Sequence, residues 1–153
     1  MMTRRYTHLI AVAVLIAAFR APISAQQETV DELRAKAYEG QVRAQLILGS
    51  KYSTGGGVPQ DAVEAVRWYR LAADQGDALA QYGLGRMYAT GSGVPQADVQ
   101  AHIWLNLGSS KMTGENRETM IKYRDNVAAR LTAEQLVEGQ RLAREWDAAH
   151  PRR

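Results

Sequence analysis

One short loop occurs twice in this chain, and its repetition constrains the fold more than any other feature. Residues 53–60 read STGGGVPQ, and residues 89–96 read ATGSGVPQ, 36 positions later. A glycine-rich loop that recurs at a fixed spacing, without a catalytic or metal-binding pattern, is typical of chains that join copies of one supersecondary unit. The sequence therefore predicts tandem repeats.

The similarity between the two copies extends well beyond the loop. At the same offset of 36, residues 44–72 (AQLILGSKYSTGGGVPQDAVEAVRWYRLA) align with residues 80–108 (AQYGLGRMYATGSGVPQADVQAHIWLNLG). Ala44, Leu48 and Tyr52 follow one another at i, i+4 and i+8, which places them on one stripe of a helix. A second stripe of helical spacing follows the loop, so each copy predicts a pair of helices.

The loop itself has the composition of a connection between antiparallel helices. Gly55 and Gly57 suit the positive φ that ends a helix, and Pro59 fixes φ and keeps the chain extended after them. Asp61, with Glu64 three residues later, has the pattern of an N-cap and its reciprocal partner. We expect the second helix of the pair to begin there.

One glycine of each copy falls inside the first predicted helix. Glycine in a helix interior costs about 1 kcal/mol relative to alanine. We expect Gly49 and Gly85 to offset this cost by letting the Trp of the second helix, Trp68 or Trp104, approach the bare backbone. The pattern predicts a packing role for these glycines.

The flanking segments predict further helices that close the ends of the array. Thr29 with Glu32, and Thr132 with Gln135, have the spacing of a capping box. Atypical end units are expected in a stack of repeats because one of their faces meets water. We predict a signal peptide at 1–25, a capping helix and the start of the array at 26–43, repeats at 44–79 and 80–114, a closing helix pair at 115–148 and a tail at 149–153.

The first 25 residues have the zones of an export signal. Arg4 and Arg5 precede an apolar run of eleven residues, Leu9–Phe19, and Ser24-Ala25 offers a processing site. Eleven residues are too few to span a bilayer as a helix, which takes about 20. We expect cleavage and a periplasmic or secreted product without a stable membrane anchor. A form tethered by the uncleaved segment is the alternative.

Removal of this segment changes the charge balance. The whole chain has 19 Lys and Arg against 16 Asp and Glu, and residues 1–25 contain three of the Arg and no acid. The remainder is therefore neutral, with 16 basic and 16 acidic residues, which disfavours nucleic acid as a partner. The chain contains no Cys, so its stability must come from packing and not from disulfides.

The repeated pattern of glycines, Val-Pro-Gln, Tyr and Trp resembles the Sel-one-like repeat, a relative of the tetratricopeptide repeat with a longer loop between its helices. The resemblance covers residues 37–110. It implies an all-α fold, an α/α superhelical solenoid of antiparallel helix pairs with divergent capping helices. It also implies a non-catalytic module that binds a protein or peptide partner.

Other classes of function have less support in the residues. The chain has no Ser-x-x-Lys, Gly-x-Ser-x-Gly or His-Glu-x-x-His pattern, and beyond the signal it has only His102, expected as a partly buried spacer, and His150, expected in a frayed tail. Some Cys-rich relatives are linked to β-lactams, so a hydrolase of β-lactam or cell-wall substrates stays open, as does a structural spacer. We predict no catalytic, cofactor-binding or metal-binding residues.

The resemblance also suggests where a partner would bind. In tetratricopeptide-like stacks the first helices line the concave side, and residues away from the packed stripe face outward. The candidate partner-binding residues are Arg43, Leu46, Ser50 and Ser53 in the first copy, and Leu79, Tyr82, Arg86 and Ala89 in the second. Arg and Tyr are common anchors at interfaces. A short array could also pair end to end with another copy, so a homo-oligomer is possible.

Overall fold

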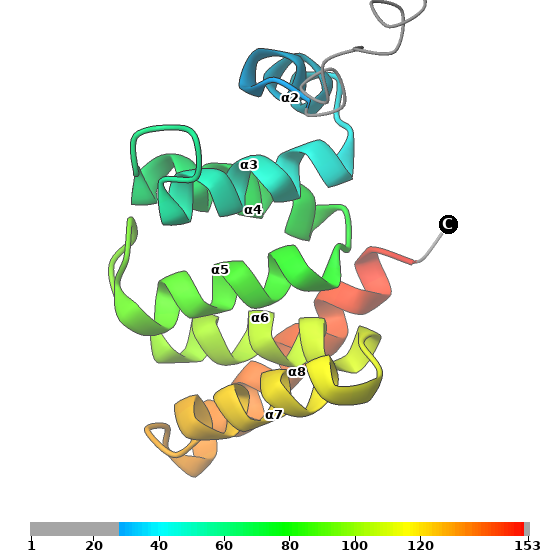
Figure 1. Cartoon of the computed structure of the whole chain (residues 1–153). Coiled ribbons are helices and arrows are strands. Elements are labelled where there is room, and N and C mark those ends of the chain that lie inside the picture. The colour runs from blue at the N-terminus through cyan, green and yellow to red at the C-terminus, as the bar shows by residue number, and fades with distance from the viewer. Residues whose placement is uncertain (1–27, 152–153) are drawn as a thin grey trace, which may run out of the picture.

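The computed structural model describes residues 28–151, and every regular element in that range is an α-helix. Figure 1 shows the helices stacked in layers from the N-terminal to the C-terminal end. The elements are α2 (Val30–Tyr38), α3 (Val42–Thr54), α4 (Ala62–Asp74), α5 (Ala78–Thr90), α6 (Asp98–Lys111), α7 (Gly114–Ala128) and α8 (Ala133–Ala149). The prediction of an all-α solenoid of packed helix pairs is confirmed.

The two copies of the repeat form the pairs α3–α4 and α5–α6. Their loops close in the same way, since Asp61 N donates to Tyr52 O at 2.9 Å and Ala97 N donates to Tyr88 O at 3.0 Å. The first loop glycine ends each first helix in the left-handed region, with φ of 77° at Gly55. The positive φ expected at the loop glycines is therefore confirmed.

Polar side chains tie each first helix to the end of the preceding second helix. Gln81 Nε2 donates to Ala73 O at 3.1 Å, and one repeat earlier Gln45 Nε2 donates to Ala37 O at 3.0 Å. Because Ala37 is the last residue but one of α2, as Ala73 is of α4, α2 stands in the place of a second helix. Repetition of buried hydrogen bonds keeps the stacking geometry the same from one layer to the next.

The helix caps agree with the sequence at two positions and differ at a third. Capping boxes are present at Thr29 and at Thr132. Asp61 accepts from the amides of Val63 and Glu64, as expected of an N-cap, but the reciprocal bond is missing. The expectation of a reciprocal partner was wrong there, because the Asp61 amide already donates to the Tyr52 carbonyl and the Glu64 carboxylate pairs with Arg67.

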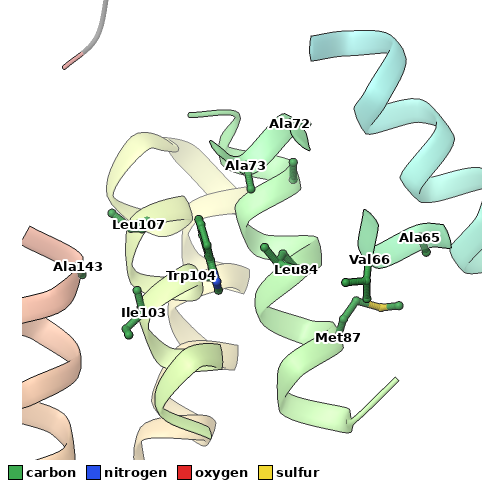
Figure 2. Close-up of a cluster of buried hydrophobic side chains, with 11 residues drawn as sticks. Ala65, Val66, Ala72, Ala73, Leu84, Met87, Ile103, Trp104, Leu107 and Ala143 are labelled. Carbon is green, nitrogen blue, oxygen red and sulfur yellow. The ribbon is translucent and has the colours of Figure 1, made fainter. Parts of the chain in front are cut away.

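The largest hydrophobic core lies between α4, α5, α6 and α8 (Figure 2). Trp104 is 5% exposed and meets Trp146 edge to face, with ring centroids 5.7 Å apart. A second core at the N-terminal end contains Trp68, which is 1% exposed and meets Tyr38 edge to face at 5.2 Å. Each repeat therefore buries its Trp against an aromatic ring of a terminal helix.

The glycines inside the first helices have packing roles, but their partners differ from the expected Trp residues. A Cβ at Gly49 would lie 2.6 Å from Cδ1 of Tyr69, and a Cβ at Gly85 would lie 2.7 Å from Cγ of Leu105. Tyr69 and Leu105 each follow the Trp by one residue. The expected pairing was wrong because the residue after the Trp faces the first helix of its own pair, while the Trp points into the core between layers.

The last two helices do not form a pair like those of the repeats. Both α7 and α8 pack against α6, and they make at most marginal contact with one another. Val127 of α7 is buried beside α6, whereas Ala143 of α8 joins the main core. The segment 115–148 thus forms the two expected helices, but the expectation of a closing pair was wrong, because each helix covers a different side of α6.

The proposed signal segment, residues 1–25, lies outside the described residues. Among the helices of residues 28–151, none is both long enough and apolar enough to cross a bilayer.

Candidate functional site

The first helices of the two repeats, α3 and α5, lie side by side and form one surface. The most distinctive feature of this surface is an aromatic ring that reaches it from α4, the second helix of the first repeat. Tyr69 belongs to α4, and its ring passes between Gly49 of α3 and Gly83 of α5. A Cβ at Gly83 would lie 3.0 Å from Cζ of Tyr69, which is tighter than ordinary van der Waals contact. The two glycines therefore make a slot for this ring.

The end of the Tyr69 ring lines a cleft between α3 and α5. The cleft has a volume of about 150 Å³. Its lining residues are Ser53, Tyr69, Gly83, Arg86, Met87, Thr90 and Ser92. Hydroxyl groups and one guanidinium thus dominate the polar groups of the cleft, and no carboxylate or imidazole is among them.

Arg86 is held at the cleft by aromatic rings of two helices. Its Cζ lies 5.8 Å from the ring centroid of Tyr82 on α5 and 5.9 Å from that of Tyr123 on α7. The two rings meet edge to face at 6.0 Å. A guanidinium is attracted to the negative faces of such rings but keeps its N–H groups for other acceptors. Within residues 28–151 the structure records no ion pair for Arg86.

The hydroxyl of Tyr69 stays protonated at neutral pH. Burial raises the pKa of Tyr69, and the neighbouring Ser50 hydroxyl, the positive charge of Arg86 and the Ser53 hydroxyl offset part of the rise. A neutral phenol can both donate and accept a hydrogen bond. Tyr69 therefore supplies a fixed polar group to the cleft.

The structure brings together part of the predicted surface. Ser53 and Arg86 line the cleft, Tyr82 flanks Arg86, and Ser50 lies beside Tyr69. These four candidates come from α3 and α5, as the sequence predicted for a first-helix surface.

The remaining candidates lie elsewhere. Arg43 is exposed and Leu79 is 44% exposed, but neither lines the cleft. Leu46 is half-buried and packs against the main core. The prediction for Ala89 was wrong, because its side chain is 4% exposed and packs in the cluster of Ala101, Leu105 and Val127.

Sequence reasoning missed Tyr69 and Gly83 as cleft residues. The signal was present as a difference between the copies, since the second copy has Leu105 where the first has Tyr69, and the first has Ile47 where the second has Gly83. The cleft therefore lies at the junction of the two repeats, where a Tyr from the first copy meets a Gly from the second.

The two histidines of the described residues lie away from the cleft. His102 is 4% exposed, more buried than the expected spacer, and burial lowers its pKa. His150 was expected in a frayed tail, but its ring stacks on Trp146 with centroids 4.1 Å apart. Between residues 28 and 151, no group of three or more His, Asp or Glu could hold a metal ion.

A second hollow, of about 860 Å³, lies where the end of α8 approaches the α4–α5 turn. Asp74, Lys111 and His150 are among its lining residues. Burial raises the pKa of Asp74, and the charge of Arg70 opposes this rise. Because cationic and acidic groups share this hollow, it favours no particular charge of ligand.

Comparison with known proteins agrees with the architecture. The profile of the Sel1 repeat matches residues 42–77 and 78–111. A search of the curated proteins found no match. The crystal structure of c5321, a protective antigen present in uropathogenic Escherichia coli strains and displaying an SLR fold, is 32% identical with a TM-score of 0.71, over 78% of this chain and 25% of that chain.

A second solved structure is similar over a shorter range. The crystal structure of a Sel1 repeat protein from Oxalobacter formigenes is 38% identical with a TM-score of 0.55, over 60% of this chain and 26% of that chain. This chain thus spans about a quarter of the length of each of the two solved chains.

The helix pairs, their repeated loops and their repeated hydrogen bonds define an α/α solenoid of tandem repeats. Proteins of this class are generally built for contact with other proteins. The repeats at 42–77 and 78–111 are Sel1 repeats, and the two similar solved structures are of proteins with Sel1 or SLR repeats.

Proposed function

We propose that this chain is a non-catalytic interaction module that binds a segment of a partner protein on the surface formed by α3, α5 and α7, here called the first-helix face. The observation that carries the proposal is the cleft at the junction of the two repeats, where Ser53, Tyr69 and Arg86 meet. Sel1-repeat proteins generally act in protein–protein interaction, and the cleft supports this face as the place of contact.

The composition of the cleft favours binding over catalysis. Ser53 and Ser92 line it, but an activated Ser needs a base within hydrogen-bond reach, and no His, Asp, Glu or Lys lines the cleft. Arg86 with Tyr82 matches the residue types that anchor protein interfaces. The hydrolase hypothesis is tested separately by turnover of a chromogenic β-lactam, which we expect to be absent.

Site-directed photo-crosslinking tests the position of the contact. A photo-reactive amino acid at Thr90, which lines the cleft, is expected to capture a partner in cells that express the chain. The matched control places it at Leu71, which is 41% exposed and lies in the C-terminal half of α4, away from the loop that carries Ser92. A partner captured from Leu71 and never from Thr90 would place the contact on the second helices and refute the proposal.

Substitutions test the anchors. Combined Arg43→Ala, Tyr82→Ala and Arg86→Ala changes are expected to weaken capture, since loss of each Arg or Tyr anchor costs about 1 to 2 kcal/mol of binding, or roughly 5 to 30 fold. Arg67→Ala, an exposed Arg of α4, is the control. Unchanged binding by the triple variant, with intact helicity, would mean that the partner binds another surface and would refute the first-helix face as the binding surface.

We further propose that the contact takes place in the cell envelope or outside the cell, after export. The export zones of residues 1–25 support this proposal. N-terminal sequencing of the protein from a periplasmic or culture fraction is expected to begin shortly after Ala25. An intact Met1 in a membrane fraction would favour the tethered form, and an intact Met1 in the cytosol would refute export.

A further inference from the structure

The charges of the chain are divided unevenly between the helices of the repeats. The first helices α3 (VRAQLILGSKYST) and α5 (ALAQYGLGRMYAT) contain Arg43, Lys51 and Arg86 and no Asp or Glu. The acids of the repeats lie on the second helices and in the turns and caps, as at Asp61 and Asp74. The residues after 25 are neutral as a whole, but the first helices are purely cationic.

Arg86 is the cation of this surface that is placed to bind a ligand. Lys51 turns away, since its Nζ donates to the Gly56 carbonyl at 3.1 Å. The guanidinium of Arg86 lies at the cleft, and no carboxylate from residues 28–151 pairs with it. Tyr82 and Tyr123 hold it from two helices, which lowers the entropy lost when it binds an acceptor.

The cleft adds hydrogen-bond donors beside this cation. The hydroxyls of Ser53, Ser92 and Tyr69 line it, and that of Tyr69 keeps its proton at neutral pH because burial raises its pKa. Thr90 contributes mainly an acceptor, because its hydroxyl donates to the Arg86 carbonyl at 3.0 Å. A cation with neighbouring hydroxyl donors is suited to an anionic oxygen acceptor.

The size of the cleft limits what enters it. An apolar cavity of about 150 Å³ holds one molecule of benzene. The cleft is of the same size, so it has room for a single side chain and not for a helix or a sugar chain. The rest of a bound segment would lie along the surfaces of α3 and α5 beside the cleft.

We propose that the partner segment is an acidic peptide, and that one Asp or Glu side chain places its carboxylate against Arg86 in the cleft. This inference rests on the proposed function and adds the chemistry of the ligand. The carboxylate accepts from the guanidinium and from the cleft hydroxyls. No acidic side chain on α3 or α5 repels it, and the three acids of α7, Glu115, Glu118 and Asp125, are balanced by three basic residues of the same helix. A basic segment would bring like charge to Arg43 and Arg86.

Selection from a peptide library tests this chemistry. Random dodecapeptides with amidated C-termini, which carry carboxylates only on side chains, are selected on the purified chain. We expect enrichment of Asp and Glu. Fluorescence anisotropy then measures binding of one selected peptide and of its variant with each Glu changed to Gln and each Asp to Asn. At least a tenfold loss of affinity is expected for the amide variant, as for the loss of a charge-assisted hydrogen bond.

Matched substitutions in the protein locate the contact. Arg86→Gln is expected to weaken binding of the acidic peptide at least tenfold, with little further loss when the peptide carboxylate is also removed. Arg67→Gln is the control, because Arg67 also lies over an aromatic ring, 5.5 Å from the centroid of Trp68, but on α4. Arg67→Gln is expected to leave affinity unchanged. Circular dichroism checks that both variants stay helical.

The outcomes separate this inference from the proposed function. Neutral or basic peptides whose binding is weakened by Tyr82→Ala would refute the acidic ligand and leave the first-helix face as the binding surface. Acidic peptides that bind equally to the Arg86→Gln and Arg67→Gln variants would refute the role of Arg86. Selected peptides insensitive to both Tyr82→Ala and Arg86→Gln, or no enrichment at all, would overturn the inference and count against the proposed function as well.

Discussion

A single methyl group added at Gly49 tests how the Tyr69 ring is confined. In an ordinary exposed helix Gly→Ala stabilises by about 1 kcal/mol. At Gly49 the new Cβ would lie 2.6, 2.8 and 2.9 Å from three carbons of the Tyr69 ring. Movement of the ring toward α5 is limited by the backbone of Gly83, because the far end of the ring already occupies the space that a Cβ at Gly83 would need. We therefore expect Gly49→Ala to destabilise the chain.

The magnitude follows from two opposing terms. Overpacking of this kind costs about 1 to 3 kcal/mol, and an overlap near the upper end is expected because ring carbons close to the backbone cannot rotate away. Subtracting the helix-propensity gain of about 1 kcal/mol leaves a net loss of roughly 1 to 2 kcal/mol. For a domain of this size, that lowers Tm by roughly 4 to 10 °C.

The assay is urea and thermal unfolding followed by circular dichroism, combined with a double-mutant cycle. In a Tyr69→Ala background the clash is gone, so Gly49→Ala is expected to stabilise by up to about 1 kcal/mol. Gly56→Ala is the control, since its Cβ would come no closer than 3.4 Å to a neighbouring atom, Oγ1 of Thr54. An effect of Gly49→Ala that has the same sign in both backgrounds would refute the confinement of the ring.

Three further predictions concern the core, a buried histidine and a helix cap. Trp68→Ala is expected to lose about 3 to 5 kcal/mol of unfolding free energy in urea, because the side chain is 1% exposed; a loss below about 1 kcal/mol would contradict its place in the core. Burial lowers the pKa of His102, with Arg124 adding to the shift and Asp125 opposing it, so the unfolded chain binds the proton more tightly. Stability is therefore expected to fall as the pH falls below about 6.5. Unfolding in urea from pH 7.5 to 5 is expected to show a weaker fall for His102→Val, and equal slopes would contradict this assignment. Thr132→Ala removes a capping box and is expected to cost about 1 kcal/mol in thermal unfolding, whereas Thr113→Ala, at an N-cap without a side-chain hydrogen bond, is expected to change little; equal effects would argue against the cap.

Much of the fold could be predicted from the sequence because its determinants are local and repeated. Helical stripes, the positive φ of Gly55 and the capping boxes at Thr29 and Thr132 depend on residues a few positions apart. The sequence also indicated the first-helix surface, and Ser53, Tyr82 and Arg86 lie at or beside the cleft. The alignment of residues 44–72 with residues 80–108 also showed that the chain is built from tandem repeats, which a single copy could not have shown.

The tertiary structure alone decided which side chain occupies each gap. The sequence predicted that Gly49 must be bare but assigned the space to Trp68, whereas Tyr69 fills it. One residue along a helix turns a side chain by about 100°, and which of the two faces Gly49 depends on how the layers pack. It placed Ala89 on the surface, whereas α6 and α7 bury it. The packing of α7 and α8 on separate sides of α6 likewise depends on contacts between distant segments, which local periodicity does not encode.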